Sequence, residues 1–110
     1  MAKYLVEASY SAEGLKGLIK ETGKGREAAI GKWIAASGGK LDSLHWSLGG
    51  SDVYLICDLP DNVTAASLSL QASSSGAIRT KTTPLFTAAE VDQAIAKGVA
   101  YRAPGAKGKK

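Results

Sequence analysis

The sequence has one cysteine, one histidine and no long hydrophobic run. The lone Cys57 excludes an internal disulfide, and a single histidine beside a single cysteine gives no cluster of metal ligands. The longest apolar run, residues 53–57, is far shorter than the ~20 residues that a membrane-spanning helix needs. The first residues lack the charged-then-apolar pattern of a secretion signal. We therefore expect a cytoplasmic protein with no metal or other cofactor and no membrane partner.

The chain also has little net charge outside its last residues and few aromatic residues. The net charge is +4, but Lys107, Lys109 and Lys110 supply three of these charges, so the rest of the chain is close to neutral. We interpret residues 103–110 as a flexible basic tail that follows a single domain, residues 1–102. Because aromatic residues make up only 6%, a surface that stacks bases is not indicated and nucleic acid is not an expected partner.

What the sequence does contain is a regular alternation of strand and helix patterns. Residues 4–10 alternate as a strand, and residues 12–37 form a helical region that is interrupted or kinked at Gly23–Gly25. A strand over 40–48 follows, then a turn, a strand over 53–59, a helix over 62–73 and a strand over 77–86. A capping box that starts at Thr87 begins a short extra C-terminal helix.

This order predicts an α+β, ferredoxin-like β-α-β-β-α-β fold. Right-handed crossovers place both helices on one face of a four-stranded antiparallel sheet. The third strand is apolar on both of its faces, with Leu55 and Cys57 on one side and Tyr54 and Ile56 on the other. Because helices cover only one face, we expect the helix-free face to pack on a second copy in a homodimer or larger homo-oligomer.

Four stretches of the sequence resemble the GYD domain family of small bacterial proteins: AKYLVEASYSAEGLKGLIKE, AASGGKLDSLHWSLGGSDVYLICDLPDN, KTTPLFTAAEVDQA and YRAPG. The resemblance spans about residues 2–105. It implies a dimeric α/β barrel, a fold shared with ferredoxin-like monooxygenases, isomerases and haem proteins. It implies no activity, because none is established for the family.

The turn at Gly50–Asp52 departs from the Gly-Tyr-Asp pattern of that family, since Ser51 stands in place of the tyrosine. This departure removes any role that depends on a phenol at the turn. Asp52 matches the pattern, and an aspartate in a turn typically accepts hydrogen bonds from backbone N–H groups.

Five residues on the predicted strands are candidates for a ligand site, either in the cleft between sheet and helices or inside the barrel: Tyr10, His45, Trp46, Tyr54 and Arg79. Two of them also have a plainer interpretation. His45 lies between serines and is typical of a surface or interface residue, and Trp33 and Trp46 are typical anchors of a core or an interface.

Two functions are favoured at this point, and nucleic-acid binding through the basic tail is a third, weaker hypothesis. The first is an oligomeric module, either structural or binding a small apolar or aromatic molecule in the cleft between sheet and helices. The second is a dimeric α/β-barrel enzyme of the monooxygenase or isomerase type, with His45 or Tyr54 as acid or base.

Overall fold

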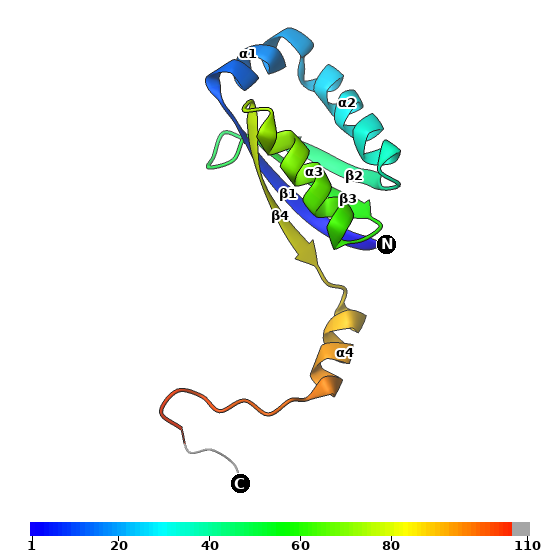
Figure 1. The fold of residues 1–110 in the computed structure, drawn as a ribbon, viewed down its shortest axis with the longest axis vertical. Helices are drawn as coiled ribbons and strands as arrows, with labels where there is room; N and C mark the ends of the chain where they lie inside the picture. The colour runs from blue at the N-terminus through cyan, green and yellow to red at the C-terminus, as the bar shows by residue number, and fades with distance from the viewer. Residues whose placement is uncertain (107–110) are drawn as a thin grey trace.

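The computed structural model describes residues 1–106, which form four strands and four helices (Figure 1). The elements are, in chain order, β1 (Ala2–Tyr10), α1 (Ala12–Glu21), α2 (Gly23–Ala36), β2 (Lys40–Trp46), β3 (Val53–Leu59), α3 (Asn62–Ser74), β4 (Ile78–Leu85) and α4 (Ala88–Lys97). The predicted ferredoxin-like α+β fold with an extra C-terminal helix is confirmed. The lysines of the predicted basic tail lie outside the described residues.

The four strands form one antiparallel sheet in the order β2-β3-β1-β4. Helix α2 packs against β2 and helix α3 against β4, so the two helices cover opposite halves of the same sheet face (Figure 1). The central strand β3 has the burial pattern expected for its position, since every second residue from Val53 to Leu59 is buried. The other face of the sheet has no helix over it among the described residues.

The predicted interruption of the first helical region is a complete break between two helices. Thr22 has a positive φ of 76° and ends α1, and its hydroxyl accepts a hydrogen bond from the Gly25 N–H at 3.2 Å to begin α2. The break therefore lies at Thr22, one residue before the glycines. The break lets α1 stay next to β1, which it follows in the chain, while α2 runs along β2.

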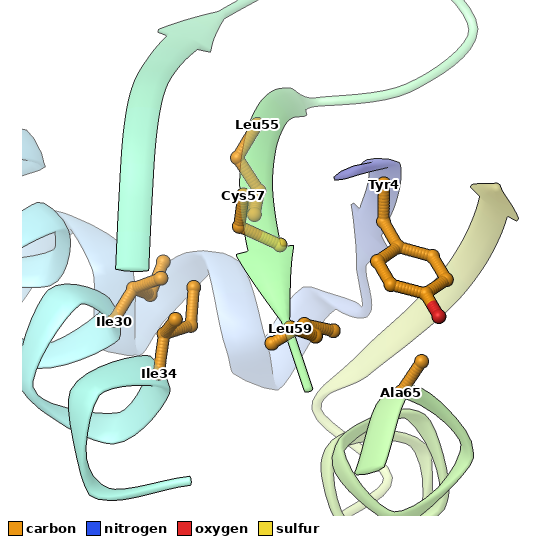
Figure 2. Close-up of a cluster of buried hydrophobic side chains, with 7 residues drawn as sticks. All are labelled: Tyr4, Ile30, Ile34, Leu55, Cys57, Leu59 and Ala65. Carbon is orange, nitrogen blue, oxygen red and sulfur yellow. The ribbon is translucent and has the colours of Figure 1, made fainter. Parts of the chain in front are cut away.

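The core lies between the sheet and the helices α2 and α3 (Figure 2). It contains Tyr4 from β1, Ile30 and Ile34 from α2, Leu55, Cys57 and Leu59 from β3, and Ala65 from α3. The ring of Tyr4 is buried, and its hydroxyl donates a hydrogen bond to the Asn62 side chain at the start of α3. This bond satisfies the one polar group that β1 contributes to the core cluster.

The chain from Phe86 onward leaves the domain, and we call residues 86–102 the C-terminal arm. Helix α4 has the predicted capping box between Thr87 and Glu90 and ends at Gly98 in the left-handed conformation. It stands well away from the sheet (Figure 1), and every arm residue is exposed. The radius of gyration is accordingly 18.1 Å, whereas a compact chain of this size has one of about 13 Å.

Candidate functional site

A cleft separates α2 from α3 and opens above the sheet; we call it the α2–α3 cleft. Its floor is apolar and is lined by side chains from β1 and β3, chiefly Val6, Ala8, Val53, Leu55 and Cys57. Its outer groove, between Trp33 on α2 and Leu68 on α3, has a volume of about 520 Å³. Its open end, beside α1, has a volume of about 550 Å³.

Cys57 lies in the floor of this cleft and is only 1% exposed. Burial raises the pKa of its thiol to about 11, so the group is protonated at neutral pH. A protonated, buried thiol is a poor nucleophile. Cys57 therefore serves as a small buried hydrophobic residue.

Two polar atoms in the wall of the cleft lack a hydrogen-bond partner among the described residues. They are the hydroxyl oxygen of Tyr10 and the Nε of Arg26, and both are buried. Both side chains line the open end of the cleft, and Arg26 also lines the cavity over the floor. Buried donors without partners are rare in folded proteins because each costs free energy. These two atoms therefore mark the open end as a place that suits a polar group of a ligand.

The Tyr10 ring is held between two elements. It stacks on the Trp46 ring of β2 with a centroid separation of 6.2 Å. On the α1 side, a side chain at Gly14 would overlap the Ala77 carbonyl oxygen and approach the Tyr10 ring to 3.0 Å. Only glycine at position 14 permits this close approach, which fixes one wall of the cleft.

The turn before β3 anchors the same end of β1. The Asp52 carboxylate accepts a hydrogen bond from the Tyr10 backbone N–H at 2.8 Å, and the Ser9 hydroxyl donates to the Gly50 carbonyl at 3.4 Å. Asp52 thus has the backbone-binding role that its place in a turn predicts. Through Tyr10, the turn motif helps to position the open end of the cleft.

The structure divides the five candidate residues between the two faces of the sheet. Tyr10 and Trp46 lie together on the helix-covered side, next to the cleft. His45 and Tyr54 are paired across β2 and β3 on the helix-free side, and Arg79 lies on that side too, opposite Ser9.

Arg26 was not among the predicted site residues. The available signal was its spacing, because Arg26 precedes Ile30 by four residues and therefore shares the buried face of α2.

The helix-free face has an apolar centre with charged residues around it. Leu5 and Ile56 are directly paired and half-buried. Beside them, Lys3 pairs with Asp42 and, at 3.1 Å, with Asp58. The two carboxylates raise the pKa of the Lys3 ammonium, and the hydrogen bond from Lys3 lowers the pKa of the Asp42 carboxyl.

The described residues contain no group of histidine, cysteine and carboxylate side chains that could hold a metal ion. None of the helices in this part of the chain has the length and hydrophobicity to span a membrane.

Comparison with known proteins gives a family and no individual relative. Neither the search of curated proteins nor the search of solved structures returned a significant match. The model of the GYD domain family matches residues 4–95, which include all of the sheet except the first two residues of β1, the α2–α3 cleft and most of α4. This chain therefore belongs to the GYD domain family.

Proposed function

We propose that the protein is a homo-oligomeric module that binds a small, largely apolar molecule in the α2–α3 cleft. One observation carries the proposal: an apolar floor meets, at the same opening, two buried polar atoms that have no hydrogen-bond partner within residues 1–106. Ligand sites are typically apolar cavities with a few polar groups that fix orientation. The cavity over the apolar floor has a volume of about 60 Å³ and receives only the tip of an apolar group. The adjoining open end, with a volume of about 550 Å³, lies in the range of about 300–1,000 Å³ that is usual for ligand sites and holds the rest of the molecule.

Filling the cleft tests this proposal. Ala72 on α3 lines both the floor cavity and the open end, whereas Ala66 on the same helix is exposed and lines neither. We expect the wild-type protein and Ala66→Trp to increase the fluorescence of the neutral apolar dye Nile red. Ala72→Trp should lose most of that increase because the indole occupies the cleft.

Circular dichroism shows whether both variants keep the native fold. Equal dye binding by folded Ala72→Trp and Ala66→Trp would place the dye elsewhere on the protein and contradict a ligand site in the cleft.

The homo-oligomer rests on surface that the single chain leaves uncovered. The helix-free face presents Leu5, Tyr54 and Ile56, and the C-terminal arm exposes Phe86 at 72% and Ile95 at 70%. A helix as short as α4 is marginal in water without packing partners. A second copy related by a two-fold axis offers both a sheet face and an arm, so one closed dimer covers both surfaces.

The enzyme alternative has no equivalent support. Its candidate acid and base, His45 and Tyr54, lie on the opposite side of the sheet from the cleft and would meet a ligand only between two sheets.

A further inference from the structure

Arg26 places a permanent positive charge at the border between the apolar floor and the open end of the α2–α3 cleft. Its side chain is 32% exposed, and its Nη1 lies 3.6 Å from the Glu21 carboxylate. Its Nε is buried and has no partner among the described residues. One edge of the guanidinium is therefore engaged by Glu21, while the Nε donor on the other side has no acceptor.

The other carboxylate at this opening does not compete for that donor. Glu13 lines the open end and lies 3.5 Å from Lys16 on the exposed side of α1. Glu21 is itself the partner of Arg26 Nη1. Glu13 and Glu21 thus each have a cation beside them, and the Arg26 Nε has no acceptor in the part of the chain that the structure describes.

We propose that the ligand of the α2–α3 cleft is an apolar carboxylate, with its carboxylate on the Nε edge of Arg26 and its hydrocarbon part over the floor. This inference rests on the proposed function. The guanidinium edge suits a carboxylate because Nε and the neighbouring Nη present two parallel N–H donors to its two oxygens. The Tyr10 hydroxyl lies in the wall of the same opening and supplies a further polar contact.

The apolar floor defines the rest of the ligand. Apart from Arg26, Trp33 and Cys57, the lining residues with polar side chains are Ser69, Thr80 and Thr82. The hydroxyls of Ser69 and Thr80 lie 2.7 Å apart and form a hydrogen bond with each other. The floor therefore offers little to a sugar or a nucleotide. It favours an aliphatic or aromatic chain, whose burial in place of water is favourable in proportion to its apolar area.

The test compares octanoate with octanamide, two probes that differ in charge at one end. We expect wild-type protein to bind octanoate at least about tenfold more tightly than octanamide in calorimetry, because hydrogen bonds to charged groups are stronger than neutral ones. Arg26→Gln should remove the difference, and Arg26→Lys should restore only part of it. Lys32→Gln, an exposed change on the same helix, serves as the matched control and should keep the full preference.

The outcomes separate this inference from the function on which it rests. If octanoate and octanamide bind equally and Nile red still binds in the cleft, the inference that the ligand is a carboxylate is wrong, and the cleft remains an apolar site. Failure of both probes to bind overturns the carboxylate ligand, and it overturns the ligand site as well if Ala72→Trp and Ala66→Trp bind Nile red equally. Because the comparison of the two probes uses wild-type protein, it remains decisive if Arg26→Gln does not fold.

Discussion

Removing two apolar side chains of the C-terminal arm tests whether a second copy covers the arm. Phe86 and Ile95 are 72% and 70% exposed in the single chain. Replacing both by alanine keeps helix α4, because Thr87 still caps it and alanine is the best helix former. In an isolated chain, such surface changes alter the free energy of unfolding by no more than about 0.5 kcal/mol.

The expected cost in a dimer follows from these exposures. Fully burying a Phe or Ile side chain is worth about 1.5–3 kcal/mol, so covering seven-tenths of one is worth about 1–2 kcal/mol. Two side chains in each of two protomers give about 4–8 kcal/mol per dimer. The dissociation constant of the double variant should therefore rise by a factor of about a thousand or more.

Sedimentation velocity over a wide range of protein concentration measures this constant. The control is Gln93→Ala, which changes a polar residue of α4 half a turn away from Val91 and Ile95 and leaves the apolar side chains in place. We expect wild type and the control to associate at concentrations where Phe86→Ala/Ile95→Ala is monomeric. A wild-type protein that stays monomeric throughout, or a double variant that associates as tightly as wild type, would refute the reasoning.

Three further predictions concern the domain itself. Leu59→Ala removes a core side chain that is 1% exposed and should lower the free energy of unfolding by about 2–5 kcal/mol in urea titrations, whereas the fully exposed Leu48→Ala should leave it nearly unchanged. The Cys57 thiol, with a pKa of about 11, should react with a thiol reagent far more slowly in native than in urea-unfolded protein, and equal rates would show that the cleft floor is open to solvent. The raised pKa of Lys3 stabilises the folded state below pH 10.5, and this stabilisation is lost as the pH rises through the pKa of the folded protein. The lowered pKa of Asp42 stabilises the folded state above pH 3.8, and this stabilisation is lost as the pH falls below that value. Lys3→Met should therefore flatten the pH dependence of the thermal midpoint at both ends, and an unchanged profile would contradict the assigned ion pairs.

Local patterns were sufficient for the order and limits of most elements. The capping box at Thr87 and Glu90 acts within one turn of helix, and the structure contains it as predicted. The alternation along β3 likewise placed Cys57 on the buried face. Such features depend on neighbours in sequence or on a period of two or of 3.6 residues, so they can be recognised without knowledge of the fold.

The candidate site was predicted less completely, because its members lie far apart in sequence. Trp46 and His45 are adjacent in β2, yet the structure places Trp46 beside Tyr10 next to the cleft and His45 opposite Tyr54 on the other face. Arg26 was missed because a charged side chain on a helix of a small domain is ordinarily solvated. Arg26 lines a cleft only because α2 and α3 lie apart over the sheet, and the sequence does not show this separation.

By itself, the sequence determined the ferredoxin-like order of elements and the family, because hydrophobic periodicity, caps and turns are encoded over short stretches. Only the tertiary structure decided that α2 and α3 leave a cleft between them. It also decided that Arg26 and Tyr10 each have, at the opening of the cleft, a buried polar atom that no other described residue pairs. It also decided that the arm after Phe86 leaves the domain (Figure 1). The physical reason is that burial and pairing depend on which elements meet in space, which no local pattern specifies.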